Sequence, residues 1–216
     1  MPSCSLSKFE SNLLVDVERL ISSHADLNHD GGGRRGLGHV TRSGVLMLCA
    51  AWELYVEELL MESVDQLCSR TSHPDNLPKV VKKELARHVK ESKNHLKPLE
   101  LAGDGWRTVL GQHAISQAKG LNTPKSTKID VLFRDLLGLE DLSGHWSLGA
   151  QAIDAFVGAR GDIAHRGRDT AYVTIASLRN YRDAVKKTVV ETDNAVCDHI
   201  RDATPGGSPW RRRPLA

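Results

Sequence analysis

A single apolar segment constrains the fold of this chain more than any other feature. From Val45 to Trp52 every residue is apolar, and the run lies within a longer helical pattern from Thr41 to Cys68. A helix that is apolar nearly all the way round must be covered by protein on every side, which places it at the centre of a helical bundle. The apolar run is far too short to cross a bilayer, so no membrane segment is predicted.

The rest of the chain also favours helices over strands. Aromatic residues make up only 5% of the 216 residues, and the strict alternation that is typical of strands is hard to find. Further helical patterns cover Phe9 to His24, Leu77 to Leu96, Trp106 to Ala118, Ser126 to Leu137, Ala150 to Arg166 and Thr174 to Ala203. We therefore predict an all-α fold, a bundle of about five to seven helices with a long central helix and a long C-terminal helix.

The helices are predicted to form one domain that covers residues 1–203. Residues 204–216 hold three prolines, two glycines and a run of three arginines, a composition that cannot continue the last helix and that predicts a disordered basic tail. The glycine-rich stretch at residues 28–38 is interpreted as a connection. It has neither the Walker spacing nor a preceding strand, so a phosphate-binding role is weakly supported.

Charge and cysteine content limit the possible functions. The formal net charge is +2, so nucleic-acid binding needs a local basic patch. The four cysteines have neither metal-ligand nor redox spacing, which indicates free thiols in a reducing compartment. Because the N-terminus also lacks a signal pattern, we expect a cytoplasmic protein. No metal site and no cofactor is predicted.

Chemically reactive side chains gather in the segment from Phe156 to Gly167. On a helix, Arg160 falls in the middle of the apolar stripe that begins at Ile153 and continues to Ala164. A guanidinium keeps its charge, so it must find partners there or line a solvated cleft. Gly167, just past the last periodic residue, predicts the end of this helix.

His165 lies about 140° around the same helix from Arg160. On one straight helix the two side chains would diverge. They can converge only if the helix tightens or ends between them, or if a second subunit supplies the opposite member. The segment is therefore either an active site or a structural helix end.

The spacing of an arginine and a histidine five residues later is weak evidence when taken alone. Arg34 and His39 share it by chance, and Arg107 with His113 matches if one more residue is allowed. Context separates the three pairs. Arg34 lies in a glycine-rich loop and Arg107 on a short helix, whereas Arg160 occupies the core stripe of a helix next to a glycine stop.

Two further features bear on a site. Glu53 follows directly on the apolar run of the central helix, where a carboxylate either has a hydrogen-bond partner or faces the rim of the core. The helix from Leu77 to Leu96 carries the best basic surface in the chain, with Lys82 and Lys83 in it. That surface is either a solvated face or a contact for an RNA backbone.

Three blocks of the sequence resemble proteins of the HEPN superfamily, of the RiboL-PSP-HEPN type. Residues 45–59 are similar to the central HEPN helix, in which an aromatic or apolar residue is followed by Glu, as Trp52 is followed by Glu53. Residues 122–125 with 129–139 look like the middle segment of that family, and residues 160–167 resemble its closing motif. The long final helix also fits, so that the resemblance covers about Thr41 to Ile200.

The closing motif departs from the family at one position. The family often has Asn, Asp or His directly after the motif arginine, and this chain has Gly161 there. Asp162, one residue further on, is the candidate replacement.

The resemblance implies a metal-independent endoribonuclease. In such enzymes the ribose 2′-OH attacks the adjacent phosphate and leaves a 2′,3′-cyclic phosphate. His165 is then expected to move the proton, and Arg160 to hold the phosphate and stabilise its charge. Asp162 and Glu53 are expected to support these catalytic residues. The candidates for RNA contact are Arg166, Arg168, Lys82 and Lys83.

The family's usual arrangement further implies a homodimer that places two motifs at one cleft. RNA is the expected partner, and a role as a toxin or defence effector implies that an antitoxin protein exists in some systems. Two alternatives stay open. The chain is a non-catalytic HEPN-like module that binds nucleic acid or a partner protein, with Arg160 and His165 structural, or it is an unrelated helical dimer.

Overall fold

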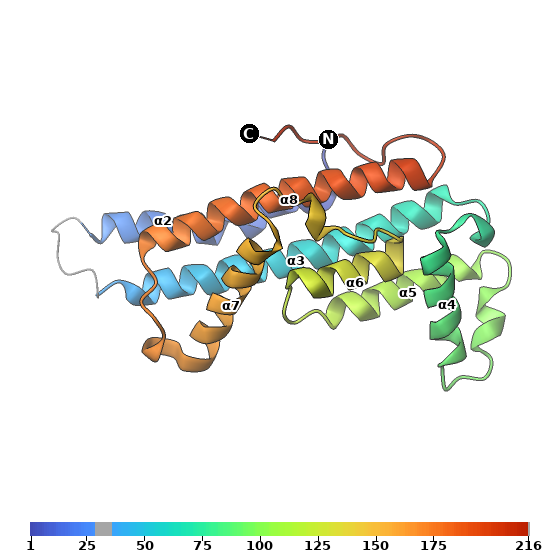
Figure 1. Cartoon of the computed structure of the whole chain (residues 1–216), viewed down its shortest axis with the longest axis horizontal. Helices are drawn as coiled ribbons and strands as arrows, with labels where there is room; N and C mark the ends of the chain where they lie inside the picture. The colour runs from blue at the N-terminus through green and yellow to red at the C-terminus, as the bar shows by residue number, and fades with distance from the viewer. Residues whose placement is uncertain (29–35, 216) are drawn as a thin grey trace.

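The computed structural model describes residues 1–28 and 36–215, and within these ranges every regular element is helical (Figure 1). The predicted all-α fold is confirmed. The elements in chain order are α1 (Cys4–Lys8), η1 (Phe9–Leu13), α2 (Val15–Asp26), α3 (Gly38–Arg70), η2 (Pro74–Asn76), α4 (Lys79–Lys90), η3 (Lys97–Leu101), α5 (Gly105–Lys119), α6 (Ser126–Leu137), η4 (Ser143–His145), α7 (Ala150–Arg166), η5 (Gly167–Asp169) and α8 (Ile175–Ala203). Most of the glycine-rich stretch, with Arg34, lies outside the described residues.

The central helix is α3, as its sequence predicts. The apolar run from Val45 to Trp52 is covered by neighbours on several sides, because α3 packs against α1, α2, α5, α6, α7 and α8. Figure 1 shows α8 running alongside α3 in the same direction, with α2 running back beside them. If α1 and α2 are taken as one rod interrupted by the π-helical turn η1, the described residues form seven α-helical rods, the upper end of the predicted number.

Two core aromatic residues of α3 have specific partners for their polar atoms. The indole nitrogen of Trp52 donates to the carbonyl oxygen of Pro124 over 3.0 Å, and the hydroxyl of Tyr55 donates to the carbonyl oxygen of Val189 over 2.9 Å. Both α3 side chains are fully buried. These bonds fix the loop before α6 and the middle of α8 against the central helix, because a buried donor left without an acceptor would cost stability.

Carboxylates on one element repeatedly bind the start of another. Asp154 of α7 accepts from the backbone N–H and the hydroxyl of Ser126 at the start of α6, each over 2.8 Å. Asp130 of α6 binds Ser143 in the same two-pronged way. A carboxylate at a helix N-terminus satisfies free N–H groups and complements the helix dipole. The position of α7 relative to α6 is therefore fixed by hydrogen bonds as well as by apolar packing.

The C-terminal segment corrects one sequence prediction. The composition of residues 204–216 predicts a disordered tail, but residues 204–215 lie along α8 and return toward the N-terminus (Figure 1). Trp210 is buried, and the side chain of Asn194 forms two hydrogen bonds with the backbone of residue 213, each 2.8 Å long. The backbone N–H of Arg211 donates to the carbonyl oxygen of Met1 over 2.9 Å. One buried indole and a set of backbone partners thus order a segment whose composition suggests a free tail.

Among the helices of residues 1–28 and 36–215, none combines the length and the apolar character that a bilayer crossing requires.

Candidate functional site

The helix that carries Arg160 and His165 is unbroken. α7 is α-helical from Ala150 to Arg166 and ends at Gly167, which has φ of +55° and whose N–H donates to the carbonyl oxygen of Ile163. A positive φ favours glycine, so the predicted stop is confirmed in position and in kind. The helix neither tightens nor ends between Arg160 and His165, so the route by which they could converge within one chain is closed. Convergence through a second subunit is the route that is left.

The apolar stripe of α7 is buried for most of its length. Ile153, Phe156, Val157 and Ile163 are covered, whereas Ala164, which was expected on the same stripe, is exposed. In Figure 1 the C-terminal end of α7 projects beyond the bundle on the side away from α8. The last turn therefore leaves the core, and the polar residues that follow Ile163 face solvent.

Arg160 is half-buried at the point where α7 leaves the core. Its positive charge acts on two residues of α3, Cys49 and Glu53, which lie one helical turn apart. Burial raises the pKa of the Cys49 thiol to about 11, and Arg160 opposes part of that rise. Arg160 has no hydrogen bond or ion pair with another described residue, so its N–H donors are available to a ligand.

Glu53 is half-buried beside Arg160. Burial raises the pKa of its carboxyl group, while the charges of Arg160 and of Lys128 at the start of α6 act to lower it. Within the described part of the chain Glu53 accepts no hydrogen bond, so it faces the rim of the core rather than a fixed donor. Of the two readings that the sequence leaves open for Glu53, the structure favours the rim position.

The remaining residues of the closing motif are exposed at the end of α7. His165 and Arg166 lie in its last turn, and Arg168 follows in η5. Asp162 is also exposed, three residues before His165, a spacing that puts both side chains on one side of the helix. The two supporting carboxylates are thus divided, with Glu53 beside Arg160 and Asp162 on the side of His165.

The lysines expected to contact RNA lie elsewhere. Lys82 and Lys83 are on α4, which Figure 1 places at the opposite end of the molecule from the C-terminal end of α7. The ammonium group of Lys82 donates to the carbonyl oxygen of Asp75 over 2.8 Å, whereas Lys83 is exposed. The residues predicted from the sequence therefore form two separate groups.

The structure also removes a competing pair of residues. Arg107 donates to the carbonyl oxygens of Cys68 and Thr71 at the end of α3, and His113 is buried against Glu84. Arg107 closes the C-terminal end of a helix, where cations are favourable. Its match to the arginine–histidine spacing is accidental.

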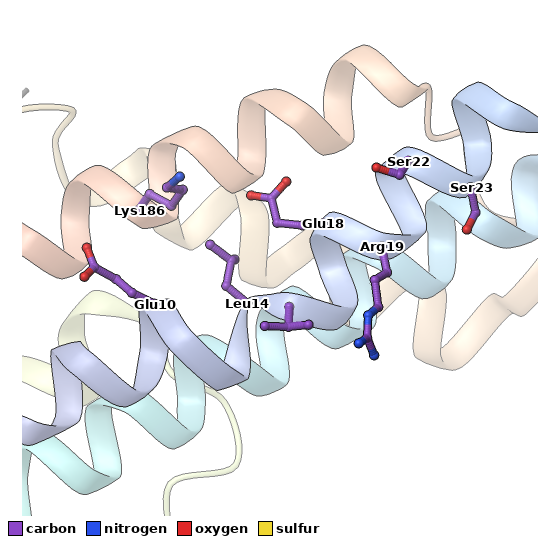
Figure 2. Close-up of a pocket in the computed structure, with 8 residues that line it drawn as sticks. Glu10, Leu14, Glu18, Arg19, Ser22, Ser23 and Lys186 are labelled. Atoms are coloured by element: carbon purple, nitrogen blue, oxygen red, sulfur yellow. The ribbon is translucent and has the colours of Figure 1, made fainter.

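A wide hollow lies away from α7. A space of about 660 Å³ opens between α2 and α8 (Figure 2). Glu10, Glu18 and Lys186 line it, with Leu14 between them, while Arg19 points away from Lys186. Two carboxylates and two cations share this lining, so its charge does not select a phosphate.

The family of the chain follows from the sequence match on this all-α fold. The sequence model of RiboL-PSP-HEPN matches residues 12–198, from the N-terminal helix to near the end of α8. The chain belongs to the RiboL-PSP-HEPN family. HEPN proteins are generally associated with nuclease activity, in particular on RNA. No curated protein and no solved structure matches the chain.

One residue near Arg160 has no signal in the sequence. Lys128 acts on Glu53 together with Arg160, although it lies on α6. Nothing in the periodicity of α6 distinguishes it from other exposed lysines, because its place beside the site depends on how α6 and α7 dock on α3.

Proposed function

We propose that this chain is a metal-independent endoribonuclease with Arg160 and His165 as its catalytic residues. The observation that carries the proposal is the position of Arg160, half-buried on the inward face of α7 beside Glu53, with its donors uncommitted. A charged side chain held at the edge of a core without a fixed partner is typical of a ligand-binding position. His165, Arg166 and Arg168 extend from the same helix into solvent.

The chemistry that we propose is transesterification within the RNA. An imidazole accepts the proton of the ribose 2′-OH as its oxygen attacks phosphorus, and the bond to the 5′ oxygen breaks. A second imidazole, protonated, donates to that leaving oxygen, and the product is a 2′,3′-cyclic phosphate. The guanidinium of Arg160 stabilises the charge that develops on the phosphate oxygens.

Two imidazoles at one site require two copies of the chain. Because α7 is unbroken, Arg160 and His165 of one copy diverge by about 140°. A homodimer that apposes the projecting ends of two α7 helices brings His165 of one copy toward Arg160 of the other. Such a twofold arrangement is the commonest form of protein oligomer.

The test is cleavage of a single-stranded oligoribonucleotide in the presence of EDTA. Wild-type protein is expected to leave a 2′,3′-cyclic phosphate end and to spare an oligonucleotide with 2′-deoxyribose at the cleaved position. His165→Ala is expected to lower kcat by about 10² to 10⁴, and Arg160→Ala by about 10² to 10³. The matched controls are His145→Ala and Arg179→Ala, two exposed positions outside α7.

Two results would reject the proposal. The first is that wild-type protein leaves RNA intact, both with EDTA and with added divalent metals. This result would reject the enzyme hypothesis and favour the alternative, a non-catalytic module that binds RNA or a partner protein. The second is full activity in His165→Ala. This result would reject His165 as a catalytic residue, although the chain could still be an endoribonuclease.

We propose a toxin or defence role for this activity, with an antitoxin as a further partner. An enzyme that cuts cellular RNA without control arrests growth. Expression of the wild-type chain is therefore expected to stop cell growth, and His165→Ala to relieve the arrest. If both forms arrest growth equally, RNA cleavage is not the cause of the toxicity.

A further inference from the structure

Three charged side chains from three different helices lie where α6 and α7 meet α3. Glu53 belongs to α3, Arg160 to α7 and Lys128 to the first turn of α6, which lies next to α7 (Figure 1). Burial raises the pKa of the Glu53 carboxyl group, and the charges of Arg160 and then of Lys128 oppose that rise. Both cations are therefore close enough to Glu53 to act on it. We call these three residues the charge cluster.

The start of α6 is anchored on both of the helices that carry the other two charges. The fully buried indole of Trp52 on α3 donates to the carbonyl oxygen of Pro124, just before α6, over 3.0 Å. Asp154 on α7 accepts two hydrogen bonds from Ser126, each 2.8 Å long. The backbone of Lys128 therefore has a fixed place relative to α3 and α7, and its side chain is a flexible cation on that fixed base.

Lys128 is not bound to any other group of the chain. It is exposed at the edge of the buried face of α6, about 100° around the helix from the fully buried Ile129. Within residues 1–28 and 36–215 its ammonium group forms no hydrogen bond and no ion pair. The carboxylate of Glu53 has no ion pair there either, so neither Lys128 nor Arg160 is held by it directly. Both cations are free to bind an anion.

The charges of the cluster select a phosphate chain as the anion. Two cations beside one half-buried carboxylate leave a positive excess. An ammonium group binds phosphate as a point charge, whereas a guanidinium binds it through paired donors. A strand of RNA carries one phosphate at every nucleotide, so a cation close to the one that holds the scissile phosphate meets the next phosphate along the strand.

We propose that Lys128 is a substrate-binding residue, which binds a phosphate of the RNA next to the one that Arg160 holds. This rests on the proposed function in that RNA is the ligand and Arg160 lies at the cleaved phosphate. Glu53 is then the counter-charge of both cations while no RNA is bound. A contact away from the reacting bonds stabilises substrate and transition state equally, so its loss raises KM and leaves kcat unchanged.

The first experiment measures cleavage and binding by the full chain with Lys128→Gln, which removes the charge and keeps the helix propensity. KM for a single-stranded oligoribonucleotide is expected to rise about three- to tenfold, with kcat within about twofold of wild type. The slope of log K against log salt, measured on a 2′-O-methyl oligonucleotide that cannot be cut, is expected to fall by about 0.7. Lys128→Arg is expected to restore KM. Lys187→Gln, an equal loss of charge on α8, is the matched control and is expected to leave KM and the slope unchanged.

A second experiment locates the phosphate that Lys128 binds. The 2′-O-methyl oligonucleotide is made with a neutral methylphosphonate at one position at a time. At the position that Lys128 contacts, this replacement is expected to weaken binding to wild type by the same factor as Lys128→Gln, and to have no effect on binding to Lys128→Gln. At every other position it is expected to affect both proteins equally.

Glu53→Gln separates RNA binding from the other role that Lys128 could have, the neutralisation of Glu53. If Lys128 acts only on Glu53, then Lys128→Gln has no effect on affinity in a protein that already carries Glu53→Gln. We expect the same loss of affinity in both backgrounds. Normal KM and affinity in Lys128→Gln, a loss confined to the background with Glu53 intact, or an equal loss in Lys187→Gln would overturn the proposal.

Because affinity is measured on RNA that cannot be cut, the outcome is separate from that of the proposed nuclease. Affinity that depends on Lys128 in a protein that cuts no RNA rejects the nuclease and keeps this contact. Cleavage with a normal KM in Lys128→Gln does the reverse. A wild-type chain that binds no RNA rejects both.

Discussion

At the scale of single residues, Gly161 is where the closing motif departs from the pattern that the family often has. A Cβ atom added there meets nothing within 4 Å, so the position has room for the polar side chain that the family often carries. Gly161→Asn is expected to raise kcat/KM for RNA roughly tenfold, the effect of one hydrogen bond to a charged group. Gly158→Asn, also in open space on α7, is the matched control. Equal gains in both variants, or none in Gly161→Asn, would contradict a role for this position.

Asp193 is a buried carboxyl group that makes stability depend on pH. Burial raises its pKa to about 6 from 3.8, a hydrogen bond from Ser3 opposes the rise, and one of its oxygens has no partner among the described residues. The folded chain therefore holds an extra proton between about pH 4 and pH 6, and the stability due to that proton is lost as the pH rises through this window.

Asp193→Asn stays neutral at every pH. Relative to wild type, its free energy of unfolding is expected to improve by about 2 to 3 kcal/mol between pH 4 and pH 7.5, as measured by urea unfolding. Asp169→Asn, at an exposed position, should show no such trend. A difference between Asp193→Asn and wild type that is constant over this range would contradict the assignment.

At the scale of elements, a glycine of α3 packs directly against α8. A Cβ on Gly44 would lie 2.4 Å from Cδ2 of Leu178, which is itself fully buried. Overpacking of this kind costs about 1 to 3 kcal/mol, more than the roughly 1 kcal/mol that Ala gains over Gly in a helix. Gly44→Ala is therefore expected to lower Tm.

Gly111→Ala on α5 is the matched control for that crossing. Its Cβ meets nothing within 4 Å, so the substitution is expected to stabilise the chain by about 0.5 to 1 kcal/mol. Thermal unfolding of the two variants decides the matter. A similar rise in Tm for both variants would show that a methyl group fits between α3 and α8 at Gly44.

The elements were also the part of the structure most open to prediction. The bounds expected for α6 and α7 from periodicity and from Gly138 and Gly167 are the observed ones, because both helices have a clear apolar face and a glycine stop. α4 was expected to reach Leu96 but ends at Lys90. Leu96 is 65% exposed, so an apolar residue without a place in the core extended the apparent pattern.

The approach of side chains from different elements could not be read from the sequence. Lys128 beside Glu53, and the stack of His88 on His113, join helices whose packing no local pattern encodes. Likewise, the order of the C-terminal segment depends on Trp210 finding a site on α8. Periodicity reports the face of a helix that is buried, but it does not report what covers that face.

At the scale of the whole molecule, the unbroken α7 predicts that the nuclease site is shared between two copies of the chain. Arg160→Ala and His165→Ala are each expected to be inactive. When wild-type chain is co-expressed with an equal amount of His165→Ala, only dimers of two wild-type chains keep both imidazoles of the shared site, so random mixing is expected to leave about a quarter of the wild-type activity. Loss of only half of the activity, in proportion to the share of wild-type chains, would place each site within one subunit.

The bond between Met1 and Arg211 has a mechanical consequence. Since both ends of the chain lie on the α8 side of the bundle (Figure 1), whatever is fused to either end emerges on that side, away from the projecting end of α7. A force applied between the two ends would act first on the hydrogen bonds that hold the C-terminal segment to Met1 and to α8. These bonds would break one after another, before α3 is sheared against α8. Under tension the chain is therefore expected to unfold from its termini, and the central helix α3 is expected to bear the force last.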